Sequence, residues 1–330
     1  MTTTTVLGAG AMGTACAWVL AQNGQRDVRL WGRSAEFTAR IRETRRNERL
    51  LPNAVLPMNV TITSDMTEAL SKADVVLVCI PMKGLRDALK DMAGLIPSDA
   101  LMVSTIKGIE VSTLKRSSEI IKELCPGNPV VALGGPCHAE EVVERKPASI
   151  VAASSTAGAA EQLQSLLSTE FLRVYVNSDL VGVELGGALK NVIAIAAGIC
   201  DGLEFGDNAK AALLTRGLSE MVRFGKLMGA DPRTFYGLAG LGDLVTTCNS
   251  RHSRNRHVGE CLGRGKKLAD IEQSMNAVAE GVLTTRSVHM LAQSKQIEMP
   301  IASQVYSMLF EGKSPREATE ELMNRPLKSE

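Results

Sequence analysis

Short apolar runs alternate with amphipathic stretches through the first half of the chain. Five runs rich in β-branched residues predict strands at 5–7, 27–31, 75–80, 101–104 and 130–133. Two further runs, at 149–153 and 173–176, extend the series. Several runs are apolar throughout, as expected for strands buried on both faces. The pattern therefore predicts an α/β domain in which helices cover a doubly wound parallel sheet.

The character of the chain changes near residue 180. From there onward the sequence is rich in Ala, Gly and Leu at helical spacing, and strand-like runs almost disappear. A length of 330 residues also suits two domains better than one. We therefore expect an α/β domain over residues 1–180 and an all-α domain over residues 181–330.

The charges of the chain are almost balanced. Lys and Arg number 37 and Asp and Glu number 36, which leaves a formal net charge of +1. No global field would then attract nucleic acid or anionic lipid, so neither partner is expected. We find no apolar run of the ~18–20 residues that a membrane span needs, so membrane insertion is not expected either.

Seven cysteines are scattered along the chain without a Cys-x-x-Cys pair. An odd, dispersed set favours reduced thiols in the cytoplasm over a disulfide framework or a zinc site. The four histidines show no metal-ligand spacing, and the first residues lack the basic and apolar regions of a secretory leader. We therefore expect a cytoplasmic protein without a bound metal.

Residues 8–13 read Gly-Ala-Gly-Ala-Met-Gly, a G-x-G-x-x-G motif that directly follows the first predicted strand. Gly8 permits a tight turn, Gly10 lets the backbone approach a pyrophosphate, and Gly13 lets a helix over 14–23 pack closely on the strand. The helix N-terminus would offer N–H groups and a positive dipole end to the phosphates. This context favours a dinucleotide site over a glycine turn without a ligand.

The second predicted strand ends at Trp31, about twenty residues after Gly13, where an NAD site usually has an acid for the ribose 2′-hydroxyl. No acid occurs there, and Arg33 follows instead. A guanidinium can bind the 2′-phosphate of NADPH, so we expect NADPH to be accepted as well as NADH. The alternative is an arginine that is simply solvated at the end of a strand.

Two later strand ends carry further candidates. Lys107 follows the strand at 101–104, and ligands of open α/β sheets lie outside the carboxyl ends of the strands. We therefore expect Lys107 to reach cofactor or substrate rather than to be an ordinary surface lysine. The strand at 130–133 leads into Gly-Gly-Pro-Cys-His-Ala at 134–139, where glycines allow close approach of a ligand to the backbone.

The segment 186–198 has the small and apolar residues of a tightly packed interior helix, yet it contains Lys190 and Asn191. A buried ammonium must be paired, lose its proton or face a polar cleft. Such a lysine is also a competent general acid or base for a carbonyl that becomes an alcohol. The alternative is a lysine whose side chain extends from the helix to water.

A polar region follows further along the chain. Asp243 and Thr247 lie in the segment Gly-Asp-Leu-Val-Thr-Thr at 242–247, and residues 250–256 read Ser-Arg-His-Ser-Arg-Asn-Arg. A dense group of Arg, Ser and Asn can bind several phosphate oxygens, with Arg forming bidentate hydrogen bonds. Taken alone, such a run is more often a solvated basic loop.

Together these segments resemble the bacterial-type NAD(P)-dependent glycerol-3-phosphate dehydrogenases. The resemblance covers essentially the whole chain, from the glycine motif to Met-Pro-Ile at 299–301. Its most specific part is Gly-Ala-Leu-Lys-Asn-Val-Ile-Ala at 187–194, which is followed by Gly198, Asp201, Gly202, Gly206 and Asn208. The segments 238–244 and 253–256 support it.

The resemblance implies a Rossmann-type domain followed by an all-α domain, assembled as a homodimer that supplies glycerol 3-phosphate for phospholipid synthesis. A hydride from NADPH or NADH would pass to the C2 carbonyl of dihydroxyacetone phosphate, and Lys190 would be the catalytic proton donor. The implied substrate contacts are Lys107, Gly135, Cys137, Lys190, Asn191, Asp243, Thr247, Ser253, Arg254 and Asn255. The implied cofactor contacts are Gly8, Gly10, Ala11, Met12, Gly13, Arg33, Lys107, Ala139, Arg254, Val278 and Glu280.

Two other functions fit part of the sequence. A 3-hydroxyacid dehydrogenase has the same two-domain plan and a lysine on a helix, but it acts on a carboxylate, whereas the cluster at 253–256 favours a phosphate. A non-enzymatic regulator that senses a dinucleotide would need the first domain, but it would not need Lys190 beside Asn191.

Overall fold

The computed structural model describes residues 2–22, 27–275, 279–327 and 329, and the chain forms two compact units. The first unit comprises Met1–Ile106 and Lys115–Glu184, and the second comprises Lys107–Leu114 and Leu185–Glu330. The division therefore lies four residues beyond the boundary that we expected at residue 180. It also groups the short segment Lys107–Leu114, which we expected in the first domain, with the second unit.

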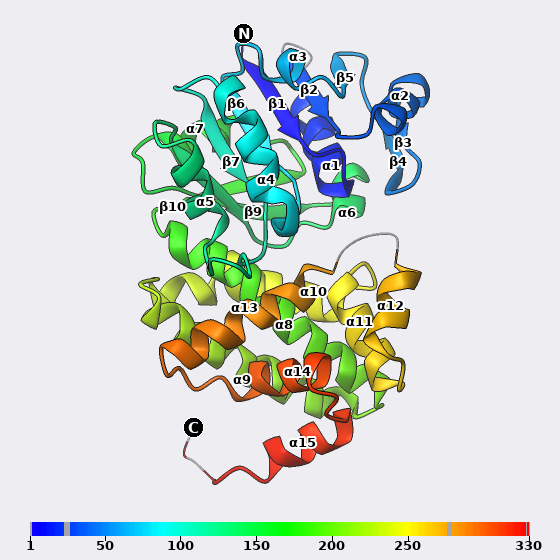
Figure 1. Cartoon of the computed structure of the whole chain (residues 1–330), viewed down its shortest axis with the longest axis vertical. Helices are drawn as coiled ribbons and strands as arrows, with labels where there is room; N and C mark the ends of the chain where they lie inside the picture. The colour runs from blue at the N-terminus through cyan, green and yellow to red at the C-terminus, as the bar shows by residue number, and fades with distance from the viewer. Residues whose placement is uncertain (1, 23–26, 276–278, 328, 330) are drawn as a thin grey trace. The chain divides into compact units, whose positions relative to one another are not determined.

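The first unit is built on an eight-stranded sheet (Figure 1). From one edge to the other the strands are β10 (Leu172–Asn177), β9 (Ala148–Ala153), β8 (Val130–Gly134), β7 (Leu101–Ser104), β6 (Val75–Val78), β1 (Thr3–Leu7), β2 (Asp27–Trp31) and β5 (Val60–Thr63). Neighbours are parallel except β8 and β9, which are antiparallel. The order reverses at β1, and such a switch point is where doubly wound sheets bind ligands.

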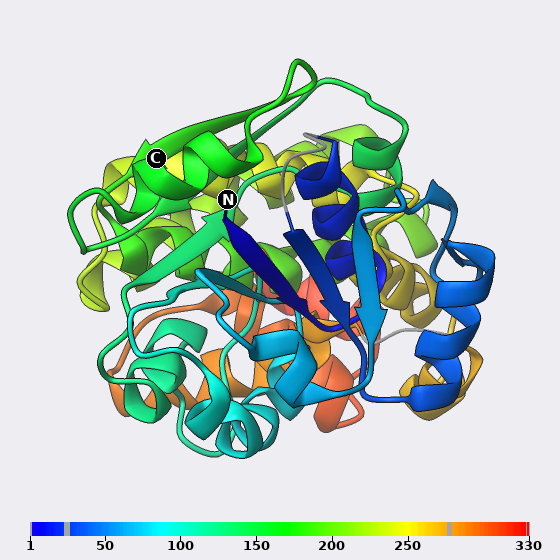
Figure 2. The same ribbon diagram turned by 90° about the horizontal axis from the view of Figure 1, so that it is seen from above.

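Helices cover both faces of this sheet, as the view in Figure 2 shows. They are α1 (Ala11–Ala21), α2 (Ala35–Thr44), α3 (Met66–Leu70), α4 (Met82–Met92), α5 (Ser117–Leu124), α6 (Ala139–Val143) and α7 (Ala159–Leu167). Residues of α1 and α7 share one apolar cluster with Val75 and Leu77 of β6, whereas residues of α3, α4 and α5 share another with Val76 and Val78. Alternate side chains of β6 thus enter opposite cores, which explains why this strand is apolar throughout.

The seven expected strands are all present, although their ends differ by a few residues. Three short strands escaped the sequence analysis: β3 (Arg46–Asn47) and β4 (Leu51–Val55), which form an antiparallel pair, and β5 at the edge of the main sheet. Exposed positions interrupt the apolar pattern in β4, and β5 is a four-residue run with polar Thr at alternate positions. The first helix begins at Ala11 rather than at residue 14, because Gly10 is its N-cap.

Apart from the segment Lys107–Leu114, the regular elements in the described residues of the second unit are helices. Its helices are α8 (Leu180–Gly202, whose first residues belong to the first unit), α9 (Gly206–Leu227), α10 (Asp243–Asn249), α11 (Arg254–Gly263), α12 (Leu268–Ser274), α13 (Glu280–Ser294), α14 (Pro300–Phe310) and α15 (Pro315–Met323). Contrary to our expectation, α8 is long and apolar enough to span a membrane by length and composition. However, 94% of its apolar stretch is buried inside the protein, as in the core helix of a globular domain.

Helices α8 and α11 touch through glycines. A Cβ atom on Gly198 of α8 would lie 1.9 Å from the carbonyl oxygen of Arg256, and one on Gly259 of α11 would lie 1.9 Å from that of Ile195. Only hydrogen fits at these two positions, so the helix backbones pack directly against each other. This contact fixes the start of α11 relative to the polar residues of α8.

Candidate active site

The glycine motif of the first unit forms a tight turn between β1 and α1. Gly8 has φ +113°, and a Cβ atom there would lie 2.9 Å from the carbonyl oxygen of Cys79. A Cβ atom on Gly13 would lie 1.9 Å from the carbonyl oxygen of Gly8. Gly8 and Gly13 are therefore required by the turn itself.

Gly10 differs from these two glycines, because a Cβ atom there would meet no atom within 4 Å. Its lack of a side chain leaves the backbone open to a ligand. It is also the N-cap of α1, and no side chain caps that helix, which begins with Ala11 and Met12 and has no acid in its first turn. An uncapped helix N-terminus beside bare backbone fits a dinucleotide pyrophosphate.

A buried amide that the sequence analysis missed supports this turn. Asn47 of β3 is fully buried, and its Nδ2 donates to the carbonyl oxygen of Ala9 at 3.0 Å and to Oγ1 of Thr14 at 2.9 Å. Its Oδ1 accepts a hydrogen bond from the backbone of Leu50. Asn47 thus ties the glycine turn and α1 to the β3–β4 hairpin. An asparagine outside any motif gave no reason to select it.

The other cofactor and substrate candidates of the first unit follow strands. Arg33 is exposed after β2, and the next residue, Ser34, caps α2 by accepting a hydrogen bond from Phe37. Gly135 follows β8 with φ +97°, and Cys137 donates from Sγ to its carbonyl oxygen at 3.3 Å. Ala139 is buried as the first residue of α6.

The second unit contains a buried centre of two lysines and one aspartate. Nζ of Lys107 lies 2.7 Å from Oδ2 of Asp243, and Nζ of Lys190 lies 3.0 Å from Oδ1 of the same carboxylate. Lys190 also donates to Oγ1 of Thr247 at 2.5 Å. The Lys190, Asp243 and Thr247 residues are each at most 5% exposed, so Lys190 does not reach out to water.

Burial and the two neighbouring lysines have opposite effects on the pKa of Asp243. Burial raises the pKa of Asp243, but the charges of Lys107 and Lys190 and their hydrogen bonds outweigh burial and hold that pKa below its usual value. The aspartate is therefore a carboxylate. With both amines protonated, the three groups sum to one positive charge in a buried setting, which suits a site where an oxygen gains negative charge.

Two asparagines from the expected substrate site form a chain of hydrogen bonds. Nδ2 of Asn191 donates to the carbonyl oxygen of Lys107 at 2.9 Å, and Nδ2 of Asn255 donates to Oδ1 of Asn191 at 2.8 Å. Oδ1 of Asn255 in turn accepts from the backbone N–H of Gly281 at 2.9 Å. The chain links the Lys107 segment, α8, α11 and α13, so both amides have a structural task.

The expected phosphate cluster forms the start of α11. Ser253 is its N-cap and accepts a hydrogen bond from the backbone of Arg256, and the exposed Arg254 is its first residue. Nε of Arg256 binds Oδ2 of Asp201 at 2.6 Å, which ties α11 to the end of α8. The helix therefore presents its N-terminus and a guanidinium together, a combination that favours anions.

The remaining candidates lie near α13. Glu280 is its first residue and is partly buried, whereas Val278 lies outside the described residues. Within the ranges that the structure describes, no group of three or more His, Cys, Asp or Glu side chains could hold a metal ion.

Comparison with known proteins adds to this geometry. Residues 3–160 match the model of the NAD-dependent glycerol-3-phosphate dehydrogenase N-terminus, and residues 179–320 match that of its C-terminus. A glycerol-3-phosphate dehydrogenase of Bacillus anthracis, described as acting with NAD(P)+, is 48% identical over 333 residues, which cover 100% of this chain and 98% of that protein.

Solved structures agree. The crystal structure of glycerol-3-phosphate dehydrogenase from Coxiella burnetii superimposes with a TM-score of 0.95 at 37% identity, and covers 98% of this chain and 99% of its own. A ternary structure of D-mandelate dehydrogenase with NADH covers 97% of this chain and 100% of its own at a TM-score of 0.64. At 15% identity the latter likeness concerns the fold alone.

Proposed function

From the premise that the chain belongs to the NAD-dependent glycerol-3-phosphate dehydrogenase family, we propose roles for its residues in that reaction. The enzyme transfers a hydride between NAD(P)H and the C2 carbonyl of dihydroxyacetone phosphate, with sn-glycerol 3-phosphate as the reduced product. One observation carries the assignment, namely that Lys107 and Lys190 share the buried carboxylate of Asp243. The hydroxyacid dehydrogenase and the regulator are not favoured, because both halves of the chain match this family.

Lys190 is the proposed proton donor in the reductive direction. NAD(P)H, when bound, would supply the hydride for the carbonyl carbon, and the carbonyl oxygen would need one proton to become a hydroxyl. The Lys190 ammonium, oriented by Asp243 and Thr247, gives that proton to the oxygen, and in the oxidative direction the neutral amine takes it back. Lys107 adds a second positive charge that stabilises the developing oxyanion.

The glycine turn and the start of α1 would hold the pyrophosphate of the cofactor. Gly8, Gly10 and Gly13 would shape this cradle, while Ala11 and Met12 would face it. Arg33, exposed after β2, would bind the 2′-phosphate of NADPH. Ala139, Glu280 and Val278 are proposed as further cofactor contacts on the family resemblance alone.

The start of α11 would bind the substrate phosphate. Ser253 and Arg254 combine a helix N-terminus, a hydroxyl and a guanidinium. Binding of the phosphate, which does not react, would hold the substrate so that its carbonyl is correctly oriented for the reaction. Asn191, Asn255, Gly135 and Cys137 are proposed as further substrate contacts by family resemblance, with the two amides also serving the hydrogen-bond chain.

The wider setting is proposed from the family resemblance and the composition. We infer a cytoplasmic homodimer that supplies glycerol 3-phosphate to phospholipid synthesis, without membrane insertion and without a nucleic-acid partner. The net charge of +1 and the seven dispersed cysteines support this setting.

The test is reduction of dihydroxyacetone phosphate by NADPH in the wild type and in Lys190→Met. Loss of the proton donor should lower kcat by on the order of 10²–10⁴ with little change in NADPH affinity. Lys226→Met, which neutralises an exposed lysine of α9, is the control and should keep full turnover. Near-normal turnover of Lys190→Met would disprove the assignment.

A further inference from the structure

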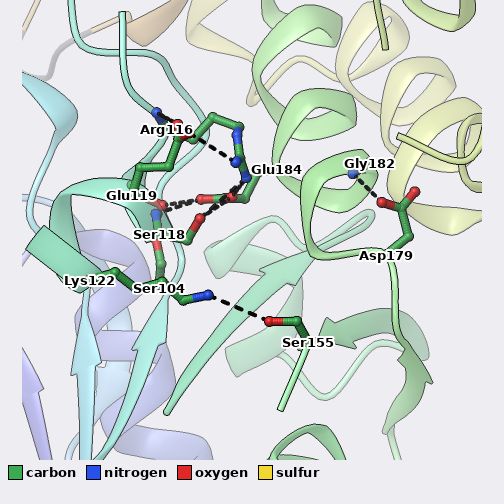
Figure 3. A network of polar contacts seen from close by, with 10 residues as sticks. Ser104, Arg116, Ser118, Glu119, Lys122, Ser155, Asp179, Gly182 and Glu184 are labelled. Atoms are coloured by element: carbon green, nitrogen blue, oxygen red, sulfur yellow. Dashed lines mark hydrogen bonds and ion pairs between the residues drawn. The ribbon is translucent and has the colours of Figure 1, made fainter. Parts of the chain in front are cut away.

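Glu184 is a buried carboxylate outside the proposed site. Its side chain is 4% exposed and lies near the start of α8 (Figure 3). It accepts hydrogen bonds from Arg116, from Oγ of Ser117 at 2.7 Å, and from both the backbone N–H at 2.8 Å and Oγ at 2.6 Å of Ser118. Loss of any of these hydrogen bonds would leave a buried charge partly unsatisfied, at a high cost in free energy. The positions of Glu184 and its partners are therefore strongly coupled.

The network continues from Ser117 toward β7. The hydroxyls of Ser117 and Ser104 lie 2.6 Å apart, and because Ser117 donates to Glu184, Ser104 donates to Ser117. Oγ of Ser104 also accepts from the backbone N–H of Ile106 at 3.2 Å. An unbroken series of hydrogen bonds therefore runs from Glu184 to the residue that immediately precedes Lys107.

Glu184 also lies on the helix that carries the second lysine. Glu184 precedes Lys190 by six residues in one helix, which corresponds to a rise of about 9 Å along a rigid element. The chain leaves the first unit after Ile106, returns to it at Lys115, next to Arg116, and leaves it again after Glu184. All three crossing points thus lie within or beside this one network, and two of them lead directly to the lysines that meet at Asp243.

We propose that Glu184 is a positioning residue, which sets the placement of Lys107 and Lys190 on Asp243 by joining α8 to the end of β7. This inference rests on the proposed function of the two lysines. Glu184 touches neither of them, and acts through Ser117, Ser104 and the backbone of Ile106 on one side and through α8 on the other. A small displacement of either lysine should lower kcat, since misplacement of reacting groups by about 1 Å can cost 10²-fold in rate.

The chain offers a matched pair of variants. Ser117→Ala and Ser118→Ala each remove one buried hydroxyl bond to Glu184, of 2.7 and 2.6 Å, but only Ser117 continues to Ser104 and Ile106. We expect Ser117→Ala to lower kcat roughly tenfold with unchanged NADPH affinity, and Ser118→Ala to stay within about twofold of wild type. Equal effects in the two variants, or none in Ser117→Ala, would overturn the proposal.

Glu184→Gln tests the carboxylate itself. It should lower kcat by about 10–100-fold, while Glu119→Gln, which neutralises the exposed acid on the other side of Arg116, should leave kcat within about twofold of wild type. If Glu184→Gln does not fold, the serine pair decides alone. A folded Glu184→Gln with wild-type kcat would overturn the proposal.

A double-mutant cycle with Lys107→Met separates positioning from general weakening of the fold. If Ser117 acts through Lys107, adding Ser117→Ala to the Lys107→Met variant should lower kcat by less than about twofold. The group that Ser117 positions is already absent in that variant. A different outcome is that Lys107→Met strongly lowers kcat and Ser117→Ala lowers it by the same factor with or without Lys107→Met. That outcome would overturn the Glu184 proposal and leave the proposed function intact. An unimpaired Lys107→Met enzyme would instead disprove the role of Lys107 in the proposed function.

Discussion

The aliphatic stem of Lys107 lies across Gly187, on the helix that also carries Lys190. A Cβ atom on Gly187 would come within 3.2 Å of Cγ of Lys107 and within 3.6 Å of its Cβ and Cδ. A glycine in this helix therefore leaves room for a second lysine to reach Asp243. The stem of Lys107 therefore packs closely on the helix because no side chain is present at this position.

This relationship predicts an activity defect without a stability defect. Gly187→Ala should press on the stem of Lys107 and lower kcat roughly three- to tenfold, because that stem must shift by a few tenths of an ångström. The substitution should leave the free energy of unfolding unchanged or raise it by up to about 1 kcal/mol, since Ala favours a helix more than Gly.

The measurements are steady-state kinetics and urea denaturation. Gly84→Ala in α4 is the control, because its added methyl would have an ordinary contact of 3.8 Å with Ile80. It should show the same helix stabilisation with full activity. If Gly187→Ala kept wild-type kcat, close packing of Lys107 on this glycine would not matter for turnover.

Arg33 should determine the preference between the two cofactors. Arg33→Asp replaces an attractive charge by a repulsive one, so NADPH should lose affinity by roughly 10–100-fold while NADH changes by less than about threefold. Equilibrium binding of each cofactor measures this. Arg40→Asp, the same charge change at an exposed position of α2, is the control. An equal loss for both cofactors would mean that Arg33 has only a structural role.

Arg254 should act on the phosphate end of the substrate. Arg254→Leu is expected to reduce kcat/KM for dihydroxyacetone phosphate by an equivalent of about 2–5 kcal/mol, and Arg254→Lys should recover only part of this because an ammonium lacks the planar fork. Dihydroxyacetone, which has no phosphate, provides the comparison. Its slow reduction should hardly differ between wild type and Arg254→Leu, and a parallel loss for both substrates would move the phosphate site elsewhere.

Glu220 should make stability depend on pH. This residue of α9 is 2% exposed and accepts hydrogen bonds from the backbone N–H groups of Ile301 and Ala302 at the start of α14. Burial raises its pKa from 4.5 to about 7, although both N–H groups oppose that shift. The folded protein then holds a proton that the unfolded chain has lost, so stability falls as pH rises from about 4.5 to 7.

Glu220→Gln removes this titration. Between pH 5 and pH 8 the free energy of unfolding of the wild type should fall relative to that of the variant by on the order of 2 kcal/mol. Urea denaturation at several pH values measures the difference, with Glu161→Gln on the exposed side of α7 as control. A constant difference across this range would show that Glu220 keeps the same protonation state in the folded and unfolded protein.

Local patterns in the sequence were sufficient for the central strands and the glycine turn. The apolar runs at β6 and β7 predict buried strands because both faces of those strands meet a core. The spacing of the glycine motif is equally local, since Gly13 avoids a clash with the carbonyl oxygen of Gly8 and Gly8 has a positive φ. The weak strands β3, β4 and β5 were missed because edge strands need few apolar residues.

A lysine in an apolar helix drew attention to Lys190, because a buried charge must have a partner. The same reasoning applied to Glu184, the acid in the first two turns of that helix, would have found the second network.

Which partners these charges have was decided only by the tertiary structure. Lys107 and Asp243 are separated by 136 positions, and Glu184 and Ser118 by 66. No periodicity relates such positions, since their meeting depends on how separate elements pack within each unit. The sequence by itself determined that buried charges had to be paired, through the high cost of an unpaired ion in an apolar interior. Packing of distant elements determined that both lysines share one aspartate, and that Glu184 is linked through Ser117 to Ser104 in the segment leading to Lys107.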